Sequence, residues 1–575
     1  GLQTTLGRNG SDHSASIFAA LSKASLLTIW TDVDGVMSAD PRLVPEAQVI
    51  DRLTYNEAME LAYFGAKVIH PQTLGPAVEN KIPVVIRNSF NSKHPGSRIE
   101  QESVPSGKIK GITAIGDMAL INLEGSGMIG VPGTADRLFT SLKDAGVSVT
   151  LISQASSEHS ICIAVPEGVS NKARNVIINA FSNELKSGQI HSVDITSGQS
   201  IVAVVGDGMA GSPGLAAKFF GTLARAGVNI NAIAQGSSER NISVVIDSSD
   251  ATKALRSSHS GFYLSAKTIS IGLIGPGTVG DALLCQIQKQ SKKLAKEFNL
   301  DLRVRGILRS KKMLLSDKRI DLESWKDNFK ISSIDTDLGA FEEHLKPDHL
   351  PHAVIIDCTA SGEISSSYKD WLSRGIHIIT PNKKAFSDSY ISYKNLKHAA
   401  KEGRSHYFYE TTVGAALPVV STLCDLIKTG DQVKSIQGIF SGTLAYLFNV
   451  FDGSTPFSEI VRAAKQSGYT EPDPREDLSG MDVARKLTIL ARELGQKIEI
   501  GDFPVKNLVP ESLRDCSVEE FLEKFSNYDS EIDSFFKKAQ AEGKKLRYVA
   551  KLDNLGNASV DLVPVAVDHP FCNIN

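Results

Sequence analysis

The chain has 575 residues, a formal net charge of −3 at pH 7 and six cysteines. This length suffices for three or four domains with sizeable cores, and the balanced charge excludes a nucleic-acid footprint or a polybasic membrane patch. The cysteines lack paired spacing, which indicates a reducing compartment without a disulfide framework, and no apolar run is long enough to cross a membrane.

The first part of the chain contains three short loop motifs. A glycine-rich run at residues 4–15 includes Arg8, whose planar guanidinium suits a carboxylate. An apolar strand, residues 26–30, precedes the run 31–42, whose acids, turn and arginine suit a nucleotide and its magnesium. The third run, 64–71, reads Phe-Gly-Ala-Lys-Val-Ile-His-Pro. Taken singly, each motif is more often a structural loop than a site.

The order and spacing of these runs resemble the C-terminal half of the aspartate kinase catalytic domain, which has the amino-acid kinase fold. The resemblance implies phosphorylation of L-aspartate by ATP with Mg²⁺. Asn9 stands where the family usually has glycine and Met37 where tyrosine is common, and the family's Lys-Phe-Gly-Gly loop is absent. By this resemblance aspartate would contact Arg8, Ser11 and Asp12, and the nucleotide would be lined by Thr31, Asp32, Met37, Arg42, Lys67 and Val68.

An internal repeat follows. Residues 119–161 align without gaps onto residues 200–242, with Ala-Gly-Val at 145–147 matching 226–228. Each copy predicts a strand, a Pro-Gly turn, an amphipathic helix, a strand, a polar turn and a strand. A gapless duplication of this length indicates two copies of one small module, and the alternative is a duplication that only joins domains.

The repeated pattern resembles ACT domains (βαββαβ), which pair side by side and bind an amino acid at their interface. By this resemblance Gln154 and Gln235, at matched strand ends, are candidate effector contacts. In aspartate kinases such modules carry feedback inhibition, commonly by threonine or lysine, and we expect threonine here. The coupling would be a population shift between two quaternary states.

A dinucleotide motif comes next. An alternating apolar strand, residues 268–274, leads into Gly-Pro-Gly-Thr-Val-Gly at 275–280, and a helix is predicted from about Asp281. Gly-x-Gly-x-x-Gly between a strand and a helix places a pyrophosphate on the helix N-terminus, and an ordinary tight turn is the alternative. The candidate cofactor contacts are Gly275, Gly277, Thr278, Val279 and Gly280.

The strands that follow extend this site. The second strand, residues 302–308, ends in Arg-Ser-Lys-Lys, and basic residues there suit the 2′-phosphate of NADP better than the 2′-hydroxyl of NAD. Strands 354–357 and 376–379 open into polar loops, and ligands bind at the carboxyl ends of parallel strands. These features predict a Rossmann domain whose further cofactor contacts are Arg309, Lys311, Thr359 and Ser361. The lysine pair at 383–384, taken alone, is more often part of a solvated loop.

The run from Gly468 to Lys486 combines acids, a terminal amine and prolines. The prolines predict a rigid loop, followed by a helix with a cap near Asp477 or Ser479 and an end at Gly495. Asp482 and Lys486 are four residues apart and would share one helix face. A surface ion pair after a Pro-rich turn is the alternative interpretation of that pair.

This run closely resembles the substrate-binding and catalytic segment of homoserine dehydrogenases. The Thr-Pro-Asn-Lys run at 380–383 and the Ser-Gly turn at 440–444 also resemble that family. The resemblance implies hydride transfer between NADP(H) and the aspartate semialdehyde/homoserine pair. By this resemblance Glu471 and Asp482 hold the substrate ammonium with support from Asp477, and Lys486 donates the proton with help from Lys383. The same resemblance places Lys383 by the nicotinamide and Gly468 by the cofactor.

Residues 409–418 resemble the monovalent-cation loop of the same family. The implied ligands of a sodium ion are Glu410 and the carbonyls of Val413, Ala415 and Leu417. Oxygen-only ligation suits a hard cation. Without the resemblance, this run predicts an apolar hinge that leads into a helix.

The order of kinase part, ACT pair and dehydrogenase resembles that of bifunctional aspartate kinase–homoserine dehydrogenases, and the resemblance covers essentially the whole chain. We therefore expect an α/β multidomain chain: a partial amino-acid kinase fold (1–105), tandem ACT domains (106–265), a Rossmann domain (266–405) and an α+β catalytic and dimerisation domain (406–575). We also expect an internal fragment of a homodimer or homotetramer, located in the cytoplasm or the plastid stroma. Two alternatives remain: a homoserine dehydrogenase with an inactive kinase scaffold, and a non-catalytic amino-acid sensor.

Overall fold

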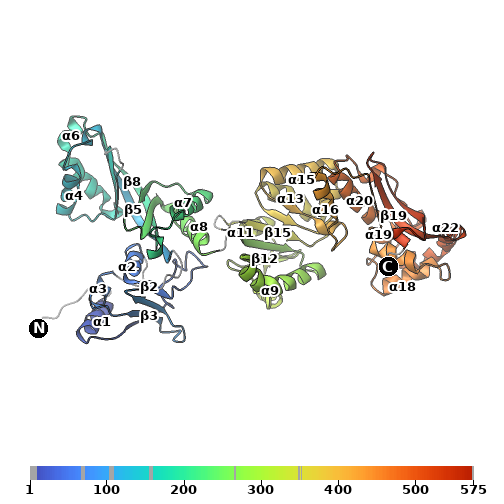
Figure 1. Ribbon diagram of the computed structural model, residues 1–575, viewed down its shortest axis with the longest axis horizontal. Coiled ribbons are helices and arrows are strands. Elements are labelled where there is room, and N and C mark those ends of the chain that lie inside the picture. Colours follow the sequence, from blue (N-terminus) through green and yellow to red (C-terminus); the bar gives the residue numbers. More distant parts are fainter. Residues whose placement is uncertain are drawn as a thin grey trace. The chain divides into compact units, whose positions relative to one another are not determined.

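The computed structural model describes residues 10–65, 71–102, 109–154, 159–264, 267–347, 350 and 352–572. The chain forms two compact units. The first comprises residues 1–269 with two short segments, 293–301 and 347–351, and the second comprises the other residues from 270 to 575. Within the described ranges, no helix is long and apolar enough to cross a membrane. The elements of each unit are labelled in Figure 1.

The first sheet of unit 1 belongs to the kinase-like part. Its strands are β1 (Leu27–Thr31), β2 (Arg52–Thr54), β3 (Val84–Asn88) and β4 (Ser97–Glu100), in the order β1-β3-β4-β2. The helices α1 (Gly10–Leu21), α2 (Tyr55–Tyr63) and α3 (Pro71–Glu79) accompany it. Thr54 and Glu57 form a reciprocal capping box at the start of α2, which satisfies two otherwise unpaired backbone N–H groups. The predicted strand at residues 26–30 is confirmed as β1.

The second sheet of unit 1 contains both copies of the repeat. Its strands are β5 (Gly111–Glu124), β6 (Leu151–Gln154), β7 (Ser160–Pro166), β8 (Ser192–Val205), β9 (Ala232–Ala234) and β10 (Asn241–Asp247). The helices are α4 (Thr134–Asp144), α5 (Ser170–Ala180), α6 (Ser182–Lys186), α7 (Leu215–Arg225) and α8 (Ala251–Tyr263). Gly133 and Gly214, with φ of 90° and 87°, precede α4 and α7 at matched positions. The predicted order of strand, helix, strand and strand is confirmed in both copies, and the polar turn of the first copy lies outside the described residues.

The two modules share their central strands. The sheet order is β6-β7-β5-β8-β10-β9. Residues 118–124 of β5 pair with the first half of β8, whereas residues 111–115 pair with residues 201–205 in its second half. The second module therefore takes its outer strand from residues that precede the first module. Residues 111–115 lie outside the aligned repeat, so self-alignment could not reveal this exchange.

Unit 2 begins with a seven-stranded sheet in the order β14-β13-β12-β11-β15-β16-β17. The helix α9 (Thr278–Phe298) lies on one side of it, and α13 (Tyr368–Ser373) and α15 (Tyr390–Glu402) lie on the other (Figure 1). Shorter helices are α10 (Trp325–Ser332), α11 (Leu338–Leu345), α12 (Gly362–Ser366) and α14 (Lys384–Ser387). The strands are β11 (Lys267–Ile274), β12 (Leu300–Leu308), β13 (Lys312–Leu315), β14 (Ile334–Asp335), β15 (His352–Asp357), β16 (His377–Ile379) and β17 (Tyr407–Phe408).

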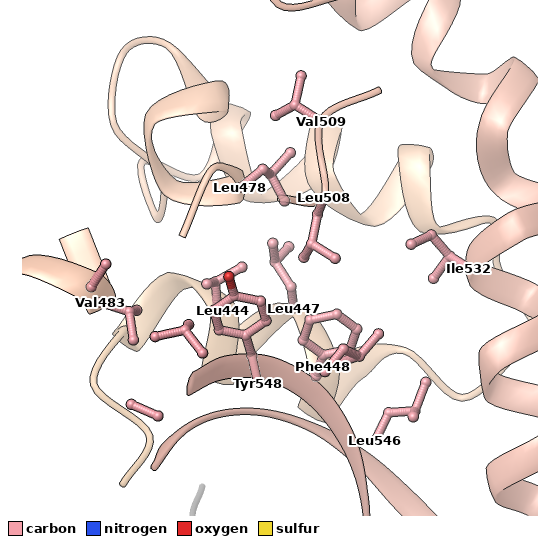
Figure 2. Close-up of a cluster of buried hydrophobic side chains, with 14 of the residues drawn as sticks. Leu444, Leu447, Phe448, Leu478, Val483, Leu508, Val509, Ile532, Leu546 and Tyr548 are labelled. Atoms are coloured by element: carbon pink, nitrogen blue, oxygen red, sulfur yellow. The ribbon is translucent and has the colours of Figure 1, made fainter. Parts of the chain in front are cut away.

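A three-stranded antiparallel sheet completes unit 2, with β18 (Ser435–Gly438), β19 (Lys544–Asp553) and β20 (Ala558–Ala566). Its core contains Leu444, Leu447, Phe448, Leu478 and Tyr548 (Figure 2). The surrounding helices are α16 (Val419–Lys428), α17 (Gly442–Val450), α18 (Phe457–Gln466), α19 (Pro474–Leu478), α20 (Met481–Glu493), α21 (Val518–Lys524) and α22 (Asp529–Ala541). Because α19 and α20 both contribute apolar residues to this core, the segment between them is held at both ends.

The start of α20 corrects one prediction. We expected a loop and then a helix capped near Asp477 or Ser479, but Pro474 already begins α19, which Asp473 caps by accepting from Arg475 N. Gly480 is the residue before α20, and no side chain caps that helix. Proline fits a first helical turn because its missing N–H would be unpaired there anyway. The predicted end at Gly495, with φ of 82°, is confirmed.

A second correction concerns α9. It begins at Thr278 rather than near Asp281, so the last part of the glycine motif is itself the first helical turn. This places the backbone N–H groups of the motif at the helix N-terminus, where they favour an anion.

Three histidines meet at the start of neighbouring strands. His352 begins β15, His377 begins β16 and His406 precedes β17, with ring centroids 6.1 Å apart for the first pair and 5.3 Å for the second. Burial, followed by repulsion from His406 and His352, lowers the pKa of His377 below its ordinary value of about 6.5. The unfolded chain therefore binds this proton more readily, and the stability that neutral His377 provides is lost as pH falls below that value.

We predict that His377→Asn reduces the amount of stability that the protein loses as the pH falls. Asparagine keeps an acceptor for His406 N, which donates to His377 Nδ1 at 2.9 Å, but it cannot take up a proton. The measurement is Tm between about pH 7.5 and pH 5. His398, an exposed histidine paired with Glu402, provides the control variant His398→Asn. Equal acid sensitivity in the parent and His377→Asn would contradict the prediction.

Candidate functional site

The glycine loop after β11 has the shape of a dinucleotide cradle. Gly275 has φ of 80°, and a Cβ there would lie 2.6 Å from Thr359 Cγ2. A Cβ on Gly280 would lie 2.4 Å from Gly275 O, whereas one on Gly277 would meet no atom within 4 Å. Two glycines are thus needed for packing and the third leaves open space. A pyrophosphate fits there, against the N-terminus of α9.

The basic residues predicted for the cofactor lie in the hairpin turn between β12 and β13. Arg309 N donates to Lys312 O at 2.8 Å, and Lys311 is exposed. The Arg309 guanidinium lies 5.2 Å from the Phe329 ring centroid and 5.8 Å from that of Trp325. These aromatic rings of α10 hold the cation in place. The hairpin adjoins the glycine loop, since Gly275 N donates to Leu308 O at 3.0 Å.

A buried carboxylate organises the next two loops. Asp357 accepts from Thr359 N at 2.8 Å, from the Tyr368 hydroxyl at 2.5 Å and from Asn382 Nδ2 at 3.2 Å. These bonds tie the loop after β15, which carries Thr359, to the loop after β16, which carries Lys383. The sequence patterns did not predict Asp357, Tyr368 or Asn382 as residues of the site. The sequence signal that could have identified Asp357 was a polar residue at the end of an apolar strand.

Lys383, Asp482 and Lys486 form an ion-pair cluster. Lys486 Nζ lies 2.7 Å from Asp482 Oδ2, and Lys383 Nζ lies 3.2 Å from Asp482 Oδ1. Lys486 Nζ also donates to Phe440 O at 2.6 Å. Burial acts to raise the pKa of Asp482, but the two ammonium groups outweigh it and leave the pKa below its ordinary value.

Two more carboxylates lie beside this cluster. Asp477 Oδ2 accepts from Glu471 N at 2.8 Å. Burial raises the pKa of both side chains, and repulsion from Asp482 raises both further. A cation placed among these carboxylates would relieve the repulsion, so the arrangement favours a ligand ammonium. Gly468, with φ of 75°, lies in the exposed turn that follows α18, and its predicted cofactor contact stays a prediction.

The predicted cation loop follows β17. The Glu410 carboxylate accepts from Val420 N and Ser421 N, both at 2.9 Å, at the N-terminus of α16. Ala415 has a left-handed φ of 49°, and Leu417 O accepts from Val419 N at 2.9 Å. Oxygen atoms accept more than one bond, so this set still suits a hard cation. Among the described residues no cluster of three or more His, Cys, Asp or Glu suits a metal, and the sodium site stays a prediction.

In unit 1, a cavity of about 360 Å³ brings together four of the predicted nucleotide contacts, Thr31, Asp32, Met37 and Arg42. Arg42 pairs with Asp40 at 2.6 Å on its rim. Ser11 and Asp12 lie on α1 and do not line this cavity. The remaining predicted contacts, Arg8, Lys67 and Val68, lie outside the described residues.

The two candidate effector glutamines lie at matched positions: Gln154 is the last residue of β6, and Gln235 directly follows β9. Gln235 lines a cavity of about 320 Å³ together with Gly211, Pro213 and Glu239. Gln154 is exposed at the end of β6 and does not line that cavity. The two edge strands touch, because Ser153 Oγ donates to Ile233 O at 2.9 Å.

Known families match segments in each of the four predicted domains. The homoserine dehydrogenase family matches residues 418–575, and the homoserine dehydrogenase NAD-binding domain matches 275–410. The amino acid kinase family matches 1–88, and the ACT domain matches twice, at 121–181 and 202–262. The predicted fold class and the assignment of the repeat are thereby confirmed.

Two relatives have the same order of parts. The chloroplastic bifunctional aspartokinase/homoserine dehydrogenase 1 of Arabidopsis thaliana is 49% identical over 100% of this chain and 64% of that protein. The bifunctional aspartokinase/homoserine dehydrogenase of Haemophilus influenzae is 42% identical over 99% of this chain and 70% of that protein. The chain belongs to the bifunctional aspartokinase/homoserine dehydrogenase family. Among solved structures, a Candida auris protein of unknown function matches 54% of this chain and 87% of its own with 34% identity and a TM-score of 0.50.

Membership of the bifunctional aspartokinase/homoserine dehydrogenase family agrees with a candidate site in each of the two units. The chain spans 64% of the length of the Arabidopsis relative. The bounds of the four domains predicted from the sequence, and the roles of the individual site residues, stay predictions.

The close packing of Gly480 leads to a prediction about the stability of the segment that carries Asp482 and Lys486. It has φ of 73°, and a Cβ there would lie 2.0 Å from the Tyr548 hydroxyl oxygen. We predict that Gly480→Ala lowers the free energy of unfolding by about 1–3 kcal/mol. The added Cβ strains the left-handed backbone conformation and collides with the Tyr548 hydroxyl. The matched control is Gly501→Ala, since a Cβ at Gly501 meets nothing within 4 Å. Denaturant unfolding of both variants measures the difference, and equal stabilities would contradict the prediction.

Proposed function

We propose that the protein containing this chain catalyses two reactions on the aspartate pathway to threonine, methionine and lysine. One is ATP-dependent phosphorylation of L-aspartate to 4-phospho-L-aspartate, and the other is NADP(H)-dependent interconversion of L-aspartate 4-semialdehyde and L-homoserine. The observation that carries the proposal is the cluster of Lys383, Asp482 and Lys486. It joins a loop at the carboxyl edge of the Rossmann sheet to the helix α20.

In the dehydrogenase reaction, the protein binds the substrate ammonium and moves one proton. Three carboxylates, Glu471, Asp477 and Asp482, face two ammonium groups, so the pocket is net negative and attracts the substrate cation. Asp482 also orients Lys486, which Phe440 O holds from another side. In reduction, Lys486 donates its proton to the substrate oxygen as negative charge develops, and Lys383 stabilises that charge.

The cofactor would be held by residues already in place. The open space over Gly277 accepts the pyrophosphate, and Arg309 and Lys311 attract the 2′-phosphate that distinguishes NADP from NAD. When bound, NADPH supplies the hydride. Thr359 and Ser361 lie on the loop that Asp357 anchors, beside Gly275.

The kinase reaction would use the cavity lined by Thr31, Asp32, Met37 and Arg42 for ATP and its Mg²⁺. Phosphoryl transfer depends mainly on positioning and charge neutralisation. Arg8, Ser11 and Asp12 are proposed to contact aspartate, as the resemblance to aspartate kinases implies.

Sodium is proposed to bind at Glu410 and the carbonyls of Val413, Ala415 and Leu417. The anchored carboxylate of Glu410 supports this site. Dehydrogenase turnover with choline in place of sodium tests it, and unchanged turnover would remove the site from the proposal. The protein is also proposed to be a homodimer or homotetramer, located in the plastid stroma or the cytoplasm. Several relatives from plants are named chloroplastic, which supports the former compartment.

The deciding experiment is NADP⁺ reduction with L-homoserine by the complete protein. We predict that Lys486→Ala lowers turnover by about a hundredfold or more, the usual contribution of an acid or base. The matched control is Lys384→Ala, because Lys384 is exposed next to Lys383 and forms no ion pair among the described residues. It should retain the parent's turnover.

Other outcomes separate the alternatives. Equal turnover in the parent and Lys486→Ala would keep the dehydrogenase and transfer the proton donor to Lys383. Homoserine oxidation without ATP- and aspartate-dependent turnover would support a kinase part that serves only as a scaffold. Threonine binding without either turnover would support an amino-acid sensor.

Regulation gives a further prediction. We propose that threonine inhibits the enzyme through Gln154 and Gln235, and the cavity beside Gln235 supports this. Gln154→Ala combined with Gln235→Ala should raise the threonine concentration for half-inhibition by about tenfold, as expected for lost hydrogen bonds. Gln189→Ala, at an exposed glutamine outside that cavity, is the control. Unchanged inhibition in the double variant would show that the effector binds elsewhere.

A further inference from the structure

One helix of the second ACT module holds the loop that forms the proposed nucleotide cavity. We call residues 36–50 the nucleotide loop. It is closed by the pairing of Met37 with Val49 and by Ile50 N donating to Val36 O at 2.8 Å. One side of this loop lines the cavity through Met37, Asp40 and Arg42. Its other side faces the ACT module.

The contacts come from successive turns of α8. Arg256 Nε donates to Leu43 O at 2.6 Å. His259 Nε2 lies 2.9 Å from Ser38 Oγ, and both residues are buried. The ring of Tyr263 stacks on that of His259 with centroids 4.5 Å apart. Residues three and four apart lie on one helix face, so Arg256, His259 and Tyr263 form a single surface of α8.

Ser38 connects this surface to the rest of the loop. Its hydroxyl accepts from Gln48 N at 2.9 Å, and its backbone carbonyl accepts from Ile112 N of β5 at 2.8 Å. Ser38 is therefore held by α8, by β5 and by the far end of the nucleotide loop. It directly follows Met37, which lines the cavity.

Apolar packing holds the same loop. Ala39 and Val44 are buried in one cluster with Phe219, Leu223 and Leu255 of the second ACT module. Ile112 and Thr113, on β5, themselves line the cavity. The regulatory sheet is thus part of the cavity wall, and a shift of α8 relative to the kinase sheet would move Ser38 and with it Met37.

We propose that Arg256 and His259 are positioning residues for ATP: they keep the nucleotide loop in its binding conformation from within the second ACT module. This inference rests on the proposed kinase function. Packed contacts of this kind have a few discrete arrangements. Loss of the α8 contacts would let the nucleotide loop leave its binding arrangement part of the time. This lowers nucleotide affinity rather than the rate of phosphoryl transfer.

The test measures ATP and aspartate kinetics of the complete protein. His259→Ala should raise the KM for ATP by about tenfold, as expected from one lost buried hydrogen bond, with kcat changed by less than about twofold. Ser38→Ala should raise that KM at least as much, because it also removes the acceptor of Gln48 N. His259→Gln should restore most of the affinity, because its amide nitrogen can reach the position of Nε2. Homoserine oxidation should be unaffected in all three variants.

A control on the same helix separates positioning from general disruption. Lys253 pairs with Asp250 at 3.0 Å and makes no contact with the nucleotide loop among the described residues. Lys253→Ala should therefore leave the KM for ATP unchanged. Calorimetric titration of ADP into each variant checks that the change lies in binding.

The outcomes are distinct. An unchanged KM for ATP and ADP affinity in His259→Ala and Ser38→Ala, in a parent with kinase activity, overturns the inference. A fall in kcat alone, or no rescue by His259→Gln, also overturns it. A parent without kinase turnover and without ADP binding would instead contradict the proposed kinase function.

Discussion

The carboxylate of Asp482 is the interaction on which the candidate dehydrogenase site depends. It contacts Lys486 at 2.7 Å on its own helix and Lys383 at 3.2 Å on the loop after β16. Two ammonium groups placed this close repel each other unless a negative charge lies between them. The Asp482 carboxylate supplies that charge, so it brings together groups from the Rossmann part and from α20.

The surrounding structure limits how far this cluster can relax. Arg492, 1% exposed near the end of α20, donates to Phe386 O at 2.7 Å and pairs with Glu499 at 2.7 Å. Phe386 lies on α14, directly after the Lys383 loop. A buried guanidinium is costly unless all its donors are used, so Arg492 specifies one relative position of α14 and α20. Asp357 likewise fixes the loop after β16, because it accepts hydrogen bonds from Tyr368 and Asn382.

In unit 1, strands shared between the two ACT modules fix the modules relative to each other, whereas in unit 2 buried charged groups fix the neighbouring elements. Because β5 and β8 each run through both ACT modules, neither module can shift without distorting the other. The same β5 supplies Ile112 and Thr113 to the proposed nucleotide cavity. The regulatory sheet and the kinase part therefore have one continuous packed structure in which α8 and the nucleotide loop meet.

The sequence by itself determined the structural features that depend only on residues close together in the chain. The glycine loop, the strand that precedes it, the repeat and the pairing of Asp482 with Lys486 follow from local steric limits and helix or strand periodicity. Only the tertiary structure decided the approach of Lys383 to Asp482, the contacts of Asp357, the strand exchange through residues 111–115 and the start of α20 directly after Gly480. Each of these depends on groups distant in the sequence, such as Tyr548 beside Gly480, and no local pattern encodes such a contact.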